Sequence, residues 1–278
     1  MKFGLIGEKL GHSQSPAIHT KLFQLLGIQG TYDLIEMNRR DVPNELIRLK
    51  REGYVGLNVT IPYKIEVMPF LADIAHEAQI IGAVNTIYMT TEGDFGYNTD
   101  YSGFGRSLDH AGIAVKDKEC VVLGTGGAAR AIVKCLYDKG AKTITVASRN
   151  PQEKKEFTAF AKTLHGRMVS YEELAAQKDG DVLVNCTPVG MYPNVDASPL
   201  AKEIVARYPA VVDLIYNPKT TRILQYAQQQ GAKTLNGMYM LVAQAIGSEE
   251  IWQKQHIDNA VIEEIAKEME KQCQLLTT

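Results

Sequence analysis

A glycine-rich run lies in the middle of the chain, between a short apolar run and a stretch of helical period. Gly124 and Gly126, with Ala129, match the pattern Gly-x-Gly-x-x-Gly/Ala. The first glycine permits a tight turn, and the second lets the backbone approach a pyrophosphate at a helix N-terminus. The run therefore predicts a bound dinucleotide, against the alternative of an ordinary strand-to-helix turn.

The next strand-like run ends in Ser148 and Arg149. A site for NAD places Asp or Glu about 20 residues after the glycines, where the carboxylate binds a ribose hydroxyl. A neutral side chain followed by a guanidinium instead suits a 2′-phosphate. These two residues therefore favour NADP, unless Arg149 is an unengaged surface residue.

A lysine and an aspartate in the first half of the chain are candidates for proton transfer. Lys64 is expected in the first turn of a helix from about Tyr63, where a cation is disfavoured unless an anion lies close. Asp100 offers that anion, although it could equally cap a helix beginning at Tyr101. Because the sequence has no metal motif to polarise a hydroxyl, proton transfer is favoured over a solvated surface role for Lys64.

Two strand-like runs flank Thr91-Glu92-Gly93-Asp94, which predicts a β-hairpin. With Glu92 and Gly93 as the central turn residues, Asn85 would lie opposite Asp100. Neighbours across a strand pair are about 5 Å apart. Two polar groups at the open end of the hairpin would then face one ligand.

Three further polar side chains are candidates for binding a ligand. Ser13 and Ser15 precede a helix expected from Pro16, at the sheet edge where open α/β folds bind ligands. Two hydroxyls beside a helix N-terminus suit a carboxylate, although helix capping explains Ser15 equally well. Gln244 is the one amide in the apolar run 237–247, and a hydroxylated ligand would supply the partners that a buried amide needs.

The elements that would position these residues alternate short β-branched runs with longer stretches of helical period, which is typical of parallel βαβ units. In the first half we expect strands at 2–6, 32–37 and 55–61 and helices at 16–26 and 42–51. After the hairpin the alternation restarts, with strands at 120–123, 143–147, 181–186 and 211–215 and a helix to about Lys139. A domain boundary is therefore expected near 101–118.

The amino-acid composition argues against several classes of protein. The 278 residues carry 30 Lys and Arg against 32 Asp and Glu, so no broad basic field for nucleic acid or a membrane surface is expected. The four cysteines lack C-x-x-C spacing, which argues against a disulfide framework or a structural zinc. No run has a signal-peptide core or the roughly 20 apolar residues of a membrane span. We expect a cytoplasmic protein with a small-molecule partner, as a monomer or a homodimer.

Eight ordered motifs together resemble the shikimate dehydrogenase family over essentially the whole chain. They are Ser13–Pro16, Asn58–Lys64, Gly82–Thr86, Gly96–Asp100, the glycine-rich run, Asn185–Met191, Asp213–Pro218 and Met240–Ala245. The resemblance implies reversible NADP-dependent oxidation of shikimate to 3-dehydroshikimate in aromatic amino acid biosynthesis. It also implies a two-domain α/β fold. A substrate domain with a mostly parallel sheet would comprise residues 1–101 and 238–278, and a Rossmann-like NADP-binding domain residues 102–237.

The resemblance also assigns roles to residues. Lys64 and Asp100 would be the catalytic pair, and no metal is implied. The substrate site would be lined by Ser13, Ser15, Thr60, Asn85, Thr99, Tyr216 and Gln244. The cofactor would contact Gly124, Gly126, Gly127, Ala128, Ser148, Arg149 and Thr187, with Gly237 and Met238 near the nicotinamide.

One departure from the family pattern bears on the cofactor. Glu153 stands where many members have a second arginine for the 2′-phosphate, which weakens selectivity for NADP unless Lys154 or Lys155 compensates. At this point two other functions stay open: a quinate/shikimate dehydrogenase that also uses NAD, and a non-catalytic homologue that senses a metabolite. The presence of both Lys64 and Asp100 speaks against the second.

Overall fold

The computed structural model describes residues 1–177 and 180–275, with side chains as far as Cys273. It divides into two compact units. The first comprises Met1–Gly103 and Val242–Ile265, and the second comprises Phe104–Leu241 with the chain from Ala266. The assignment of a substrate function to 1–101 and 238–278, and of a cofactor function to 102–237, stays a prediction. No helix in the described part of the chain is long and apolar enough to cross a membrane.

The first unit is built on a six-stranded mixed sheet. Its strands are β1 (Lys2–Gly7), β2 (Thr31–Glu36), β3 (Tyr54–Val59), β4 (Asp73–Ile74), β5 (Thr86–Met89) and β6 (Asp94–Tyr97), in the order β2-β1-β3-β5-β6-β4. The first three strands are parallel, as their apolar runs predict, and β5 pairs antiparallel with both β3 and β6. The carboxyl ends of β1 and β3 therefore meet at one edge of the sheet.

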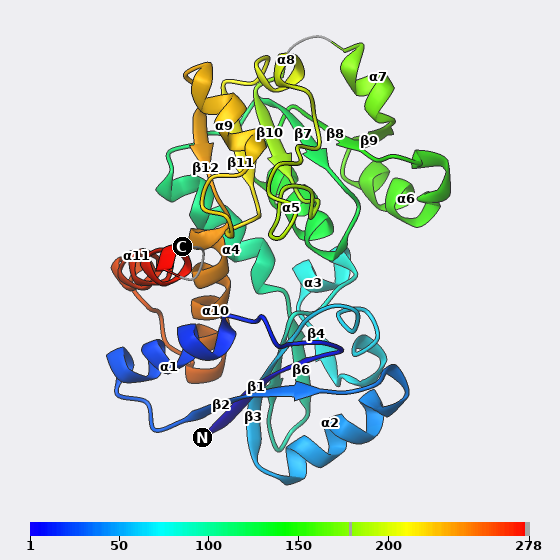
Figure 1. The fold of residues 1–278 in the computed structure, drawn as a ribbon. Helices are drawn as coiled ribbons and strands as arrows, with labels where there is room; N and C mark the ends of the chain where they lie inside the picture. Colours follow the sequence, from blue (N-terminus) through cyan, green and yellow to red (C-terminus); the bar gives the residue numbers. More distant parts are fainter. Residues whose placement is uncertain (178–179, 276–278) are drawn as a thin grey trace. The chain divides into compact units, whose positions relative to one another are not determined.

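Helices cover both faces of this sheet (Figure 1). The helices of this unit are α1 (Ser15–Leu26), α2 (Val42–Arg51), α3 (His76–Ile81) and parts of α4 (Thr99–His110), α10 (Met238–Gln253) and α11 (Asn259–Leu275). Leu46 of α2 belongs to one apolar core, and Phe23 of α1 packs with Phe3 and Trp252 in another. Gly56 of β3 lets Trp252 lie against the strand, because a Cβ there would come within 2.3 Å of its ring.

The β5–β6 hairpin has a longer loop than the sequence suggested. Thr86 pairs with Tyr97 and Met89 with Asp94, so four residues close the turn and the register differs by two from the predicted one. Thr90 stabilises the longer loop, since its side chain accepts a hydrogen bond from the amide of Gly93 at 3.2 Å. The predicted cross-strand pairing of Asn85 with Asp100 is therefore wrong.

The helix expected from Tyr63 is also absent. The chain forms successive turns and one 3-10 turn, η2 (Met68–Phe70). Pro69 lacks the amide donor that a continuing α-helix would need at this position, which limits helix growth here. Burial of Tyr63 and the hydrogen bond from the Val84 amide to the Lys64 carbonyl, 2.8 Å long, fix the turn instead. The helix-dipole argument for Lys64 is therefore wrong.

The second unit contains a six-stranded parallel sheet. Its strands are β7 (Glu119–Leu123), β8 (Thr143–Ala147), β9 (Gly166–Val169), β10 (Val182–Asn185), β11 (Ala210–Asp213) and β12 (Lys233–Leu235), in the order β12-β11-β10-β7-β8-β9. The connecting segments include α5 (Gly127–Asp138), η3 (Pro151–Glu153), α6 (Lys155–Thr163), α7 (Tyr171–Ala175), α8 (Lys202–Val205) and α9 (Arg222–Gln229). The strand order reverses between β7 and β10, and ligands of such sheets bind where the loops diverge at that point.

Candidate functional site

An ion pair between Lys64 and Asp100 is the centre of the polar site in the first unit. Lys64 Nζ lies 2.5 Å from Asp100 Oδ2, and the two side chains are only 16% and 11% exposed. Lys64 comes from the turns after β3, and Asp100 from the first turn of α4. The helix is not capped by Asp100, because Asn98 Oδ1 accepts from the Tyr101 amide. The Asp100 carboxylate is therefore available to orient the lysine amine.

Asn85 fixes the other side of the Asp100 carboxylate. Its Nδ2 donates to Asp100 Oδ1 at 3.0 Å and to Thr99 Oγ1 at 3.0 Å. Its Oδ1 accepts from the Thr99 amide at 2.7 Å, which fixes the orientation of the amide group. Both carboxylate oxygens of Asp100 are thus held, although Asn85 does not stand opposite Asp100 in the ladder.

A layer of buried polar side chains continues from Asn85 into the unit. Thr86 Oγ1 donates to Asn85 Oδ1 at 3.0 Å and lies 2.9 Å from Ser248 Oγ. Asn58 Nδ2 donates to Ser248 Oγ at 2.8 Å, and Asn58 Oδ1 accepts from the Tyr32 hydroxyl at 2.7 Å. Sequence reasoning gave no role to Tyr32, Asn58, Thr86 or Ser248. The one available signal was polar residues inside otherwise apolar strand and helix patterns.

The serine pair lies at the start of α1. The helix begins at Ser15 itself, so the prediction that Ser15 caps it is wrong. Ser13 takes part in holding the helix start, since its Oγ accepts from the Ser15 amide at 3.2 Å. Burial raises the pKa of the Tyr32 phenol, and the Ser15 side chain opposes this rise.

The remaining predicted substrate residues are placed in both units. Thr60 follows β3, where its amide donates to the carbonyl of Ile6. Gln244 lies one turn before Ser248 on α10. Gly103 of α4 lets the two helices pack closely at this point, because a Cβ at position 103 would lie 2.9 Å from the backbone nitrogen of Gln244. In the second unit, Tyr216 follows β11, and Gly237 and Met238 lie at the start of α10. The roles of these residues stay predictions.

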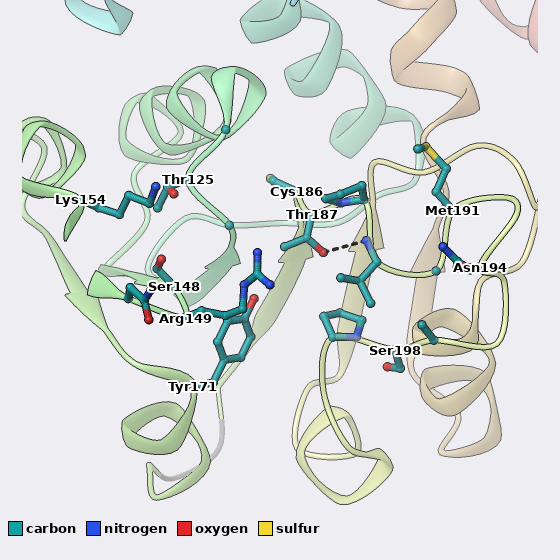
Figure 2. A pocket seen from close by; sticks show the side chains of 18 of the residues that line it. Thr125, Ser148, Arg149, Lys154, Tyr171, Cys186, Thr187, Met191, Asn194 and Ser198 are labelled. Carbon is teal, nitrogen blue, oxygen red and sulfur yellow. Dashed lines mark hydrogen bonds between the residues drawn. The ribbon is translucent and has the colours of Figure 1, made fainter. Parts of the chain in front are cut away.

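A cavity of about 1470 Å³ lies in the second unit at the carboxyl ends of the strands. Figure 2 shows Thr125, Ser148, Arg149 and Lys154 on one side of it and Thr187 on the other. This volume exceeds the roughly 300 to 1000 Å³ of ordinary small-molecule pockets, as an extended dinucleotide requires.

The glycine-rich loop forms the floor of this cavity between β7 and α5. Gly124 adopts φ +96°, a left-handed conformation that favours glycine, and a Cβ there would lie 2.9 Å from Thr187. Gly126 precedes the first residue of α5, and a Cβ at this position would meet nothing within 4 Å. The backbone at Gly126 is thus open to a ligand phosphate at a helix N-terminus.

The Ser148–Lys154 end of the cavity carries charges of both signs. Arg149, Glu153 and Lys154 all line it, whereas Lys155 begins α6 and does not. Asn150 Nδ2 lies 3.3 Å from Glu153 Oε2, so the carboxylate is held by a neighbour. Of the two lysines considered as compensating for Glu153, only Lys154 lies in the wall of the cavity.

A second buried carboxylate, Asp213, fixes the opposite wall. Asn185 Nδ2 donates to Asp213 Oδ1 at 2.9 Å, and Thr187 Oγ1 donates to Asn185 Oδ1 at 2.7 Å. Thr187 Oγ1 in turn accepts from the Val189 amide, drawn as the dashed line in Figure 2. Burial raises the pKa of Asp213 to about 6, although hydrogen bonds from Thr221, Ile215 and Asn185 lower it. Asp213 and Asn185 were quoted in motifs but received no role from the sequence.

Two family profiles match the chain in succession. Residues 5–87 match the profile described as the shikimate dehydrogenase substrate binding domain. Residues 108–214 match the profile described as shikimate / quinate 5-dehydrogenase. The glycine-rich loop, Ser148, Arg149 and Thr187 fall inside the second match, whereas Lys64 and Asn85 fall inside the first.

Individual relatives match nearly the full length. The chain is 44% identical over 268 residues to a shikimate dehydrogenase (NADP(+)) of Clostridium perfringens strain 13, covering 96% of this chain and 97% of the relative. It resembles the crystal structure of a chorismate mutase/shikimate 5-dehydrogenase fusion protein from Clostridium acetobutylicum, with TM-score 0.94, 47% identity and 98% coverage of both chains. A shikimate 5-dehydrogenase of Thermus thermophilus, in complex with NADP(H) and shikimate, gives TM-score 0.86 and 34% identity over 96% of this chain and 99% of that one.

The buried state of Asp213 predicts a pH-dependent stability. The folded chain keeps the Asp213 proton up to about pH 6, whereas an unfolded aspartate loses it near the ordinary value of 3.8. The Asp213 contribution to the free energy of unfolding is therefore full below about pH 4 and is lost as the pH rises through 6, by about 3 kcal/mol. Asp213→Asn removes this titration. In urea unfolding between pH 4 and 7, the free energy of unfolding of the variant should rise relative to that of the wild type by about that amount.

Asp181→Asn is the matched control. A hydrogen bond from the Glu119 amide, and then one from Lys118, lower the pKa of Asp181, so its contribution has the opposite sign. The free energy of unfolding of Asp181→Asn should therefore not rise relative to that of the wild type over the same pH range. A difference between Asp213→Asn and the wild type that stays constant from pH 4 to 7 would contradict the raised pKa.

Proposed function

Because the chain belongs to the shikimate dehydrogenase family, we propose that it catalyses the reversible NADP-dependent reduction of 3-dehydroshikimate to shikimate, a step of aromatic amino acid biosynthesis. The Lys64–Asp100 pair held by Asn85 is the observation that carries this proposal. A metabolite sensor would need to bind its ligand but would not need an amine fixed in this way. We further propose that the enzyme acts in the cytoplasm, as a monomer or a homodimer, without nucleic acid or membrane partners.

The second unit is proposed to hold NADP. The open backbone at Gly126 and the cavity of about 1470 Å³ suit an extended dinucleotide. Contacts to it are proposed for Gly124, Gly126, Gly127, Ala128, Ser148, Arg149, Thr187, Gly237 and Met238. When bound, NADPH supplies the hydride that reduces the substrate carbonyl.

Lys64 is proposed to handle the proton of the reaction. In the direction of reduction, its ammonium stabilises the negative charge that develops on the carbonyl oxygen and then donates a proton to it. In the direction of oxidation, the neutral amine accepts the proton of the reacting hydroxyl. Asp100 orients the amine, because its second oxygen is fixed by Asn85 at 3.0 Å.

The other polar groups of the first unit are proposed to bind the substrate. Two neighbouring serine hydroxyls, Ser13 and Ser15, suit the carboxylate. The hydroxyls of the ring and the reacting carbon are assigned to Thr60, Asn85, Thr99, Tyr216 and Gln244. This division follows the chemistry of the ligand, since hydroxyl and amide side chains pair with a polyol acid without adding net charge.

Replacement of the lysine tests the proton-transfer role. Lys64→Ala should lower kcat for shikimate oxidation by about 10² to 10⁴, with a smaller effect on KM, because a general acid or base contributes that much. Steady-state assays that follow NADPH absorbance measure both constants. Lys50→Ala is the control, since Lys50 forms an ion pair with Asp94 at 2.6 Å outside the site. Near-normal turnover by Lys64→Ala would remove Lys64 from the mechanism.

Replacement of the arginine tests the choice of cofactor. Arg149→Ala should lower kcat/KM for NADP by about 10- to 100-fold, the size expected for a lost charge-assisted hydrogen bond, and leave that for NAD nearly unchanged. Arg167→Ala is the control, because Arg167 bonds Thr145 and Gln177 and does not line the cavity. Equal losses with both cofactors would argue against a contact between Arg149 and the 2′-phosphate.

A further inference from the structure

We propose that Tyr32 is a positioning residue for substrate binding, which acts by fixing the orientation of the Asn58 amide and, through it, the polar layer that supports Asn85. This inference rests on the proposed function, because it concerns the same substrate site. Tyr32 lies on β2, which is an edge strand and carries no residue of the predicted site. Its hydroxyl nevertheless reaches Asn58, near the end of β3.

The phenol of Tyr32 donates to Asn58 Oδ1 at 2.7 Å. A phenol has one proton, so this bond uses the only donor of Tyr32 and requires the oxygen of the Asn58 amide, not its nitrogen, to face β2.

The same bond decides which way the Asn58 amide faces. With its oxygen on Tyr32, Asn58 directs its nitrogen to Ser248 Oγ at 2.8 Å and to Thr86 Oγ1 at 3.2 Å. Thr86 then donates to Asn85 Oδ1, and Asn85 donates to Asp100. Without the phenol, the buried Asn58 oxygen loses its partner, and the opposite amide orientation is no longer excluded. Asn58 is only 5% exposed, so water does not replace the lost bond freely.

The ring of Tyr32 is held independently of its hydroxyl. It stacks on His19 with ring centroids 4.0 Å apart and planes within 10°. His19 is itself fixed by a buried contact of its Nδ1 with Glu249 Oε1 at 2.8 Å and lies against Trp252. Removal of the hydroxyl alone therefore leaves the packing of the ring intact. Burial raises the pKa of Tyr32, and the charge of Glu249 raises it further. The phenol therefore keeps its proton at neutral pH.

Tyr54 provides a matched control on the neighbouring part of the same sheet. Its hydroxyl donates to Asp33 Oδ2 at 2.6 Å, at the opposite end of β3 from Asn58, and reaches no residue of the polar layer. Tyr54→Phe and Tyr32→Phe each delete one phenolic oxygen and one hydrogen bond. A merely structural contribution would affect stability in both variants and substrate binding in neither.

The experiment compares full-length wild type, Tyr32→Phe and Tyr54→Phe in shikimate oxidation with NADP. Tyr32→Phe should raise KM for shikimate about three- to tenfold, the loss expected for one hydrogen bond, with kcat within about twofold and KM for NADP unchanged. Tyr54→Phe should match the wild type in all of these constants.

Two outcomes would overturn the positioning role while leaving the proposed function in place. They are an unchanged KM for shikimate in Tyr32→Phe, or an equal rise in that KM in Tyr54→Phe. Calorimetric titration with shikimate gives the dissociation constants without turnover, and thermal unfolding checks that both variants fold. A wild type that neither oxidises nor binds shikimate would overturn the proposed function, and with it this inference.

Discussion

The fixed carboxylate of Asp100 is the constraint on which the substrate site depends. One oxygen accepts from Lys64 at 2.5 Å and the other from Asn85 at 3.0 Å, so the group cannot rotate without breaking a bond. A largely buried charge is tolerated only when it is paired and hydrogen-bonded. The polar layer of Thr86, Ser248 and Asn58 meets this requirement by supporting Asn85. The amine of Lys64, held in this way, has a defined position relative to the substrate oxygen that it is proposed to protonate.

The second unit uses the same arrangement for a different purpose. Asn185 donates to Asp213 as Asn85 donates to Asp100, at 2.9 and 3.0 Å. Asn85 Oδ1 accepts hydrogen bonds from the backbone amide and the hydroxyl of Thr99. Asn185 Oδ1 accepts the same two hydrogen bonds from Thr187. The difference lies in the partner of the carboxylate. Asp100 faces a lysine, whereas Asp213 faces the hydroxyl of Thr221, which suits a structural group that carries no proton for the reaction.

The sequence predicts the parallel strands well because buried strands are near-continuous apolar runs between turn residues. It fails where local geometry depends on distant contacts. The hairpin register follows from a four-residue loop that Thr90 stabilises, and Pro69 with the buried Tyr63 replaces a helix by turns. Lys64 and Asp100 were singled out because their residue types suit proton transfer, and Asn85 through an incorrect hairpin register and the family resemblance; the fold places the three in contact. Tyr32, Thr86 and Ser248 were missed, since single polar residues in apolar patterns gain meaning only when the fold brings them together.

The proposed mechanism requires the primary amine of Lys64 to deliver the proton, and chemical rescue of Lys64→Ala tests this requirement. Methylammonium carries a transferable proton, whereas tetramethylammonium has the same charge without one. Added to Lys64→Ala, methylammonium should raise kcat for reduction of 3-dehydroshikimate in a saturable manner, and tetramethylammonium should leave it unchanged. Equal stimulation by the two ions would mean that Lys64 supplies only positive charge, and would contradict its role as the proton donor.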